Sequence, residues 1–165
     1  MIELVRYSDK HITELVRILN QSEVIKWILM PPVPYLIEDA ESYLGKCRNN
    51  LNSDIEYNFA VELNSKYIGG SVLRRTGDDM NCAFVGYHIG KEYWGKGYGA
   101  LALRKLVKFG FEIMKLKKIK AFIFEDNIVS EKLLIKCGFI YNAEIKNKVY
   151  KGKTVYNLKY FSLEA

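Results

Sequence analysis

The stretch that most constrains the fold of this chain is VGYHIGKEYWGKGYGALALRKL, residues 85–106. An apolar run ends in a loop that holds Gly95, Gly97 and Gly99, and the loop leads directly into a helical pattern. The first N–H groups of a helix have no partner within the helix and lie at the positive end of its dipole. Glycines let the backbone approach a bound group closely because they carry no Cβ. The spacing therefore predicts a strand–loop–helix unit that cradles a phosphate or diphosphate.

Other interpretations of this glycine loop are weaker. The pattern GxxxxGK[ST] of P-loop nucleotidases is absent. Gly95-x-Gly97-x-Gly99 differs from the GxGxxG of dinucleotide-binding domains, in which an acidic residue follows about 20 positions later. A tight turn without any ligand stays open as an alternative, although such a turn needs fewer glycines. Lys96 adds a positive charge within the loop.

The rest of the chain indicates one mixed α/β domain over residues 1–165, with one central sheet. Apolar periodicity predicts helices after Ser8 to residue 19, at about 22–28, from about 38 to 47, at 97–115 and at 129–137. Strands are predicted at 57–63, 66–73, 82–89, 119–124, 139–149 and 155–162. The run 119–124 is nearly all apolar, which is typical of a strand covered on both faces. Gly138 occupies the position of a left-handed helix cap.

Composition excludes several classes of protein. The chain is 49% hydrophobic and 27% charged, as in ordinary globular domains. Its start, MIELVRYSDK, lacks the apolar core of a signal peptide, and no apolar run approaches the roughly 18 residues that cross a bilayer. We therefore expect a cytoplasmic protein that is not embedded in a membrane.

The cysteines indicate neither a metal site nor disulfides. Cys47, Cys82 and Cys137 are widely spaced and form no CxxC pair, while the two histidines lie in unrelated segments. An odd number of scattered cysteines fits a reducing compartment. We expect no metal cofactor.

The net charge of +6, from 25 Lys and Arg against 19 Asp and Glu, favours anionic ligands or partners. Lysines cluster at residues 115–120 and 146–153, so a nucleic-acid-binding module is one alternative. Aromatic residues do not interleave with these lysines as a stacking surface requires, which makes nucleic acid the weaker choice. An ordinary solvated surface explains the charge equally well.

Four segments resemble the GNAT acetyltransferases, specifically the branch that includes the ribosomal-protein N-terminal acetyltransferases. WGKGYG, residues 94–99, fills the diphosphate signature [Q/R]-x-x-G-x-[G/A] with Trp94 in place of Gln or Arg, as is common in that branch. EDNIVSEKLLIKCGF, residues 125–139, matches the pattern N-x-x-S…G-F. VRYSDKHITELVRIL and EDAESYL are similar to that branch's N-terminal helices. The resemblance covers essentially the whole chain.

The resemblance implies the GNAT fold: a central, mixed but mostly antiparallel sheet of six to seven strands flanked by about four helices, whose fourth and fifth strands splay apart. It also implies acetyl-CoA (coenzyme A), a polyanion, as the co-substrate in that gap. The implied cofactor contacts are His88, Ile89, Trp94, Gly95, Lys96, Gly97, Tyr98, Gly99, Ala100, Asn127 and Ser130. His88 and Ile89 would offer backbone groups to the pantetheine arm. Asn127 and Ser130 are equally suited to capping a helix.

The implied reaction transfers the acetyl group to a primary amine, with the Ile89 N–H polarising the thioester carbonyl. Many members of the superfamily place a tyrosine as general acid where this chain has Leu134, so we predict that Ser130 protonates the thiolate. The general base is Glu144, on the same strand face as Asn142 if the strand is regular, or His88, or a chain of waters. A lone histidine on a strand is also often structural.

The acceptor stays open at this level. The branch favours a peptide N-terminus, which is an argument by analogy, and a polyamine, an antibiotic or an amino acid is the alternative. Residues 31–37 and 141–153 are the predicted walls of the acceptor site. A non-catalytic sensor that binds coenzyme A is a second alternative, suggested by Leu134 and the shifted Glu144. A homodimer is compatible with the sequence.

Overall fold

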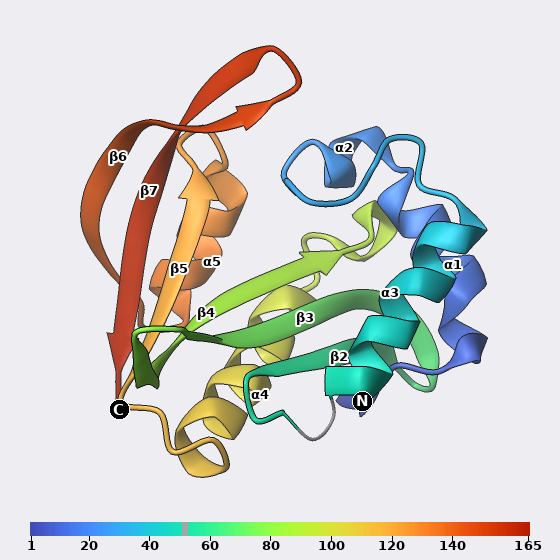
Figure 1. Cartoon of the computed structure of the whole chain (residues 1–165), viewed down its shortest axis with the longest axis horizontal. Helices are drawn as coiled ribbons and strands as arrows, with labels where there is room; N and C mark the ends of the chain where they lie inside the picture. The colour runs from blue at the N-terminus through green and yellow to red at the C-terminus, as the bar shows by residue number, and fades with distance from the viewer. Residues whose placement is uncertain (51–52) are drawn as a thin grey trace.

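The computed structural model of the chain describes residues 1–50 and 53–165, with only the backbone of Asn147 and Lys148 (Figure 1). Its helices and strands are β1 (Ile2–Arg6), α1 (Ile12–Leu19), α2 (Ser22–Ile25), α3 (Ile37–Asn49), β2 (Glu56–Leu63), β3 (Lys66–Thr76), β4 (Asp79–Ile89), α4 (Tyr98–Glu112), β5 (Lys118–Phe124), α5 (Ile128–Lys136), β6 (Ile140–Lys151) and β7 (Thr154–Glu164). Short 3₁₀ turns at Asp9–His11 and Lys91–Tyr93 lead into α1 and into the glycine loop.

The described residues form one seven-stranded sheet in the order β1-β2-β3-β4-β5-β7-β6. Neighbouring strands are antiparallel except β4 and β5, which confirms the mixed, mostly antiparallel sheet. Strand β1 was not predicted from the sequence. Its five residues pair with β2 from Ile2↔Leu63 to Arg6↔Phe59, and such a partner far along the chain is invisible to local periodicity.

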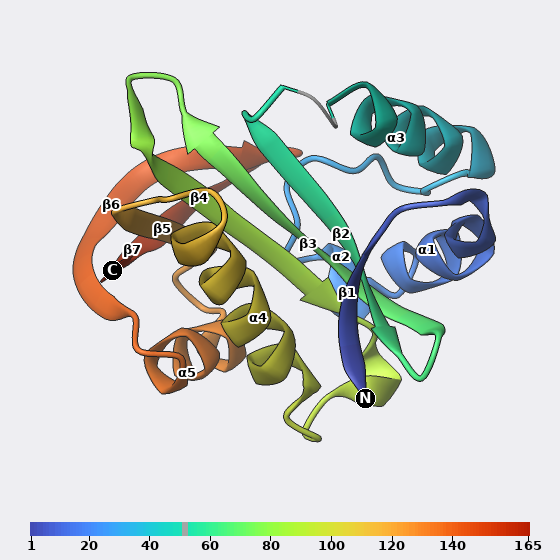
Figure 2. The same ribbon diagram turned by 90° about the horizontal axis from the view of Figure 1, so that it is seen from below.

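Helices cover the two faces of the sheet in separate layers (Figure 2). On one face, Leu15 and Ile18 of α1 pack with Leu44 of α3 in a single apolar cluster. On the other face, Leu106 of α4 and Leu134 of α5 belong to a second cluster. Both layers follow the amphipathic spacing seen in the sequence, because each helix buries one stripe against the sheet.

The sheet divides between β4 and β5. These strands pair in parallel only at Cys82↔Lys118, Ala83↔Ile119 and Phe84↔Lys120, and then diverge (Figure 1). Beyond this point β4 stays with β3, while β5 stays with β7 up to Phe124↔Leu158. Three residue pairs therefore join two half-sheets, and the splay expected from the resemblance is confirmed.

The expectation that β5 is covered on both faces is wrong. Ile119 and Ala121 are buried under α4 and α5, whereas Phe122, which points to the other face, is 39% exposed. The Phe122 ring lies between those of Phe84 and Tyr160, with centroids 5.4 and 5.0 Å away. Helices cover only one face of β5, so this aromatic row borders the gap.

The chain after α5 turns as expected. Gly138 has φ +92°, the left-handed conformation that lets the chain leave α5 and enter the β6–β7 hairpin. In the part of the chain that the structure describes, no helix combines the length and apolarity needed to span a membrane.

Candidate functional site

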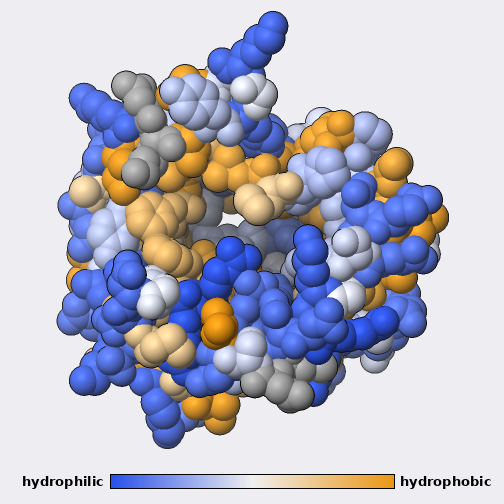
Figure 3. Space-filling view, in the orientation of Figure 1, coloured by the Kyte–Doolittle hydropathy of each residue, from blue (hydrophilic) through white to orange (hydrophobic). Residues whose placement is uncertain are grey.

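A cavity of about 700 Å³ occupies the gap between β4 and β5, and it appears as a hollow at the centre of Figure 3. Its walls come from β4, the glycine loop, β5, α5 and the segment after α2. All the predicted cofactor contacts except Lys96 line it. Its size is in the range of sites for small molecules and cofactors.

The glycine loop has the backbone of an anion cradle. Gly95 and Gly97 have φ values of +74° and +79°, which side chains other than glycine rarely adopt. Leu101 is the first residue of α4 whose N–H meets a backbone acceptor, the Gly97 carbonyl at 3.1 Å. Among the described residues, the N–H groups of residues 98–100 have no backbone partner, so they are free to bind an anion at the cavity wall.

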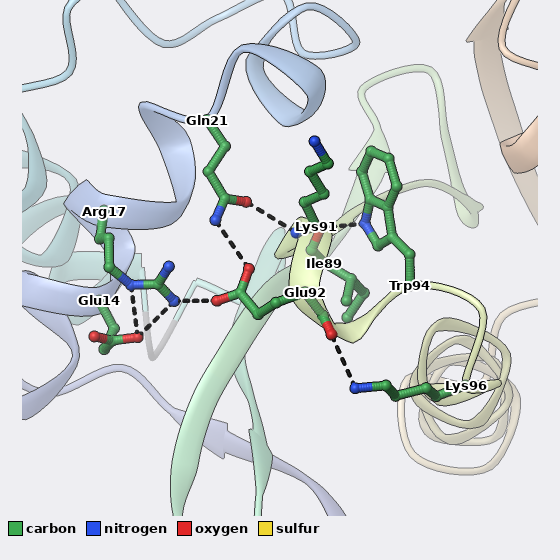
Figure 4. Close-up of polar contacts among 8 residues, drawn as sticks. All are labelled: Glu14, Arg17, Gln21, Ile89, Lys91, Glu92, Trp94 and Lys96. Carbon is green, nitrogen blue, oxygen red and sulfur yellow. Dashed lines mark hydrogen bonds and ion pairs between the residues drawn. The ribbon is translucent and has the colours of Figure 1, made fainter.

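Contacts with α1 and with the residue that precedes α2 hold the entrance to this loop (Figure 4). The Gln21 side chain accepts a hydrogen bond from the Lys91 N–H and donates one to the Glu92 carboxylate, each 2.9 Å long. Arg17 forms an ion pair with the same carboxylate. Lys96 Nζ donates to the Glu92 carbonyl at 3.0 Å, so this lysine braces the loop instead of lining the cavity.

Trp94 supports the end of β4. Its indole Nε1–H donates to the Ile89 carbonyl at 2.7 Å (Figure 4). The residue that departs from the family signature therefore has a structural role that the sequence did not suggest. This hydrogen bond uses the Ile89 carbonyl, one of the backbone groups predicted to contact the pantetheine arm.

The hydrogen-bond alternation of β4 decides which amides face the gap. Gly90 N–H donates to the Ile68 carbonyl at 2.9 Å, so the register makes His88 a hydrogen-bonded pair with Gly70 of β3. The backbone groups of His88 therefore face β3, contrary to the prediction. The same alternation directs the N–H groups of Tyr87 and Ile89 towards the gap.

Asn127 and Ser130 lie together at the start of α5. The Asn127 side chain caps the helix by accepting a hydrogen bond from the Ser130 N–H at 3.2 Å, which confirms the capping interpretation. Both residues also line the cavity. Leu134, where a tyrosine was missing, is fully buried in the core.

Tyr87 is a cavity residue that sequence reasoning missed. Its hydroxyl lies 2.6 Å from Ser130 Oγ, although the two residues are 43 positions apart. Burial raises the pKa of the Tyr87 hydroxyl above its usual range. The only signal in the sequence was a tyrosine two residues before Ile89, on the same face of an otherwise apolar strand.

The His88 side chain lies on the opposite face of β4 and is partly buried. Its Nε2 is 3.1 Å from the Tyr67 hydroxyl. Burial lowers the pKa of His88 to about 4, so the imidazole is neutral at pH 7 but only weakly basic. A general base works best with a pKa near the working pH, which makes His88 a poor match.

Glu144 is not brought to the cavity. It lies on β6, does not line the cavity, and accepts a hydrogen bond from Asn157 at 3.3 Å. A bulge between Tyr141 and Ala143 interrupts the strand. Side chains no longer alternate regularly between the two faces there, so Glu144 cannot be placed on the face of Asn142 by strand periodicity. The role of Glu144 as base stays a prediction.

The acceptor end of the cavity has different walls from those predicted. No described residue of the ranges 31–37 and 141–153 lines it, whereas Trp27, Ile28 and Leu29 do. The β6–β7 hairpin still reaches this end, because Lys151 Nζ donates to the Ile28 carbonyl at 2.7 Å. Burial lowers the pKa of Lys151.

Metal chemistry has no visible basis within the described residues. Over residues 1–50 and 53–165, no three or more His, Cys, Asp or Glu side chains are grouped as metal ligands would be.

Comparison with known proteins agrees with this geometry. The family described as "Acetyltransferase (GNAT) domain" matches residues 2–140. The chain is 33% identical to the "Uncharacterized N-acetyltransferase YoaA" of Bacillus subtilis over 49% of the chain and 46% of that protein. It is 27% identical to the "Putative ribosomal N-acetyltransferase YdaF" of Bacillus subtilis over 93% of the chain and 84% of that protein. The chain spans about half the length of the first curated relatives that it matches.

The fold has close counterparts among solved structures. RimJ of Mycobacterium smegmatis, solved in complex with CoA-disulfide, superposes with a TM-score of 0.91 at 19% identity, over 99% of this chain and 82% of RimJ. At this identity the likeness shows a common fold. Together with the family match over most of the chain, it establishes that this protein belongs to the GNAT acetyltransferase family, with relatives in the ribosomal-protein branch.

Proposed function

We propose that this protein is an N-acetyltransferase that uses acetyl-CoA to acetylate the α-amine at the N-terminus of a peptide. The observation that carries the proposal is the row of unpartnered N–H groups at residues 98–100, which opens onto a cavity between two splayed strands. A diphosphate fits the positive end of α4, and an extended arm fits the gap.

The chain's own groups fit acyl transfer at the middle of this gap. When bound, acetyl-CoA supplies the activated acetyl group. The Ile89 N–H faces the gap and would polarise the thioester carbonyl, a contact whose loss typically costs about 3 kcal/mol of transition-state stabilisation. The hydroxyl groups of Tyr87 and Ser130 lie on the same wall and would supply a proton to the departing thiolate.

The walls at the acceptor end are apolar and aromatic, which suits a peptide better than a polycation. Trp27 and Phe124 line this end, with ring centroids 6.2 Å apart. The ammonium group of Lys26 already lies over the Trp27 ring, 4.7 Å from the ring centroid. Glu23, in the adjacent helix α2, is ion-paired with Lys91. Among the described residues, Asp126 is the one carboxylate that lines the cavity, so a polyamine would find a single anionic partner there.

The choice of an α-amine rests on the weakness of the available base. Burial lowers the pKa of His88 to about 4 and Glu144 does not line the cavity, so we infer that the amine arrives already neutral. An α-amine has a pKa of about 7.7–8.0 and an alkylamine such as lysine about 10.4, so at pH 7.4 about a fifth to a third of the first but only about a thousandth of the second is neutral. The site therefore favours an α-amine.

The test measures thiol release from acetyl-CoA with two acceptors between pH 7 and 9: a short peptide with a free N-terminus and spermidine. The peptide should react at pH 7 and level off above about pH 8, following its own ionisation. The rate with spermidine should be small and rise about tenfold per pH unit. An equal rate with both amines at pH 7 would contradict the choice of an α-amine.

Calorimetry with coenzyme A separates the enzyme from the sensor. Binding of coenzyme A without thiol release from acetyl-CoA, across a wider panel of amines and peptides, would replace the proposal with the non-catalytic alternative. Absence of coenzyme A binding would contradict both the enzyme proposal and the sensor alternative.

A further inference from the structure

The departing thiolate needs a proton, and the position where many family members carry a tyrosine cannot supply it. That position is Leu134, which has no exposed surface and packs in the core under α4. If the proposed acetyl transfer is correct, the proton must come from another part of the cavity wall.

Two hydroxyl groups meet at the wall where the proton is needed. Tyr87 projects from β4 and Ser130 from the first turn of α5, and their oxygens are 2.6 Å apart. Both residues line the cavity. Tyr87 lies on the same strand face as Ile89, two residues from the N–H that faces the thioester in the proposed complex. The pair thus replaces the missing tyrosine of α5 with a phenol from β4 that meets a serine of α5.

We propose that Tyr87 donates the proton to the departing thiolate and that Ser130 is the positioning residue that orients the Tyr87 hydroxyl.

Acidity assigns the two roles in this order. Of the two hydroxyl groups the phenol is the stronger acid, although burial raises the pKa of Tyr87 above its usual range, so Tyr87 matches a thiolate better than Ser130 does. Ser130 is fixed by the cap that Asn127 makes to its N–H, which suits a residue that positions another. Either hydroxyl can donate in this contact, and in the proposed step the Ser130 hydroxyl donates to the Tyr87 oxygen and stabilises the phenolate that forms. Burial keeps the pKa of Tyr87 above its usual range, so the phenol is protonated throughout the neutral range.

The step balances without an added reactant. The C–S bond breaks and its electron pair stays on sulfur, the O–H bond of Tyr87 breaks, and an S–H bond forms. The amine nitrogen loses one proton when the amide forms, and this proton restores the Tyr87 hydroxyl, directly or through water. The enzyme therefore ends the cycle in its starting protonation state.

The first test compares Tyr87→Phe with Ser130→Ala in thiol-release kinetics, using the intact chain. Tyr87→Phe should lower kcat about 100-fold with KM for the acceptor and affinity for coenzyme A within about twofold, as for loss of a general acid. Ser130→Ala should lower kcat only about tenfold, because the acid remains. The double variant should be no worse than Tyr87→Phe, since the two residues act as a unit.

Tyr57→Phe is the matched control. Tyr57 also lies against the α4 layer and donates a hydrogen bond, 2.8 Å long, to Asp54, but it does not line the cavity. Its variant should retain the wild-type kcat. Thermal unfolding of all variants shows whether a loss of kcat reflects a loss of fold.

The second test does not depend on turnover. It measures the pKa of the thiol of bound coenzyme A from the pH dependence of its thiolate absorbance. A phenol that donates to this sulfur stabilises the thiolate, so Tyr87→Phe should raise the thiol pKa by about one unit while Tyr57→Phe leaves it unchanged. This result stands even if the wild-type protein acetylates none of the amines tried, which would count against the proposed function alone.

Three outcomes would overturn the assignment. A kcat for Tyr87→Phe within twofold of wild type would show that Tyr87 does not protonate the thiolate. A larger loss in Ser130→Ala than in Tyr87→Phe makes Ser130 the donor. An unchanged thiol pKa in folded Tyr87→Phe with coenzyme A bound shows that the phenol does not reach the sulfur.

Discussion

The two ends of the cavity are built differently. The cofactor end is made of backbone: glycine-permitted turns, unpartnered amides at the start of α4, and strand amides that face the gap. Its supports come from Arg17 of α1 and from Gln21, which precedes α2. The acceptor end is made of side chains, chiefly Trp27, Phe122 and Phe124. The hydrogen bond from Lys151 to the Ile28 carbonyl closes this end.

This difference indicates which end of the cavity determines the specificity for the acceptor. Backbone amides recognise any ligand with the right phosphate and amide spacing, and most side-chain substitutions leave them in place. Apolar side chains define shape, and a few substitutions change the shape. In the proposed enzyme, the cofactor end would therefore fix the chemistry, while the acceptor end would select the amine.

The largest effect is expected from breaking the backbone cradle. Gly97→Val places a β-branched residue at φ +79°, where no neighbouring atom lies within 4 Å, so the change acts through the backbone alone. Strain of ~1–2 kcal/mol and lost amide contacts should weaken coenzyme A binding about 100-fold in calorimetry. Gly45→Ala, also with open space around it but in α3, should bind normally. Normal binding by folded Gly97→Val would show that the cradle is not the cofactor site.

An intermediate effect is expected at the acceptor end. Phe122→Ala removes a cavity-lining ring and should raise KM for the peptide about tenfold, as expected for ~1.5 kcal/mol of lost apolar contact. Affinity for coenzyme A should stay unchanged. Phe84→Ala is the control, since that ring is similarly exposed at 37% but does not line the cavity. Equal changes in both variants would mean that the acceptor does not contact this wall.

The smallest effect is expected at the brace between α1 and the glycine loop. Gln21→Ala removes two exposed hydrogen bonds, to Lys91 and Glu92, and should weaken coenzyme A binding only two- to fivefold, about 0.5–1 kcal/mol. Arg74→Ala, which removes an exposed ion pair with Glu56 far from the loop, should leave binding unchanged. A loss in Gln21→Ala as large as that in Gly97→Val would make the connection between α1 and α2 part of the cofactor site and narrow the contrast between the two ends.

The sequence pattern predicted the turns, caps and helices that depend on neighbouring residues in the chain. The turn at Gly97 and the cap at Gly138 follow from single residues, and the helices follow from their apolar stripes. Strand β1 was missed because its partner lies far along the chain. The exposed face of β5 was misjudged because an apolar strand beside a cavity has the same composition as a buried one.

Sequence reasoning identified the glycine loop of the candidate site but missed the contact between Tyr87 and Ser130 on which the proposed catalysis depends. The family signature identified the loop, but the contact between Tyr87 and Ser130 joins positions 43 residues apart. The bulge in β6 shifted Glu144, and a single inserted residue of this kind leaves no mark in the sequence. The low basicity of His88 likewise follows from burial, which only the folded chain creates.

The three-pair junction between β4 and β5 has a further consequence. Exposed strand edges usually lie on the outside of a protein, where other strands can pair with them and cause aggregation. Here the divergence creates an unpaired edge inside the molecule, between two halves of one sheet. A folded partner is too bulky to enter, whereas a thin, amide-bearing chain can bind along it. The protein thus keeps the hydrogen-bonding capacity of a free edge without the risk of sticking to its neighbours.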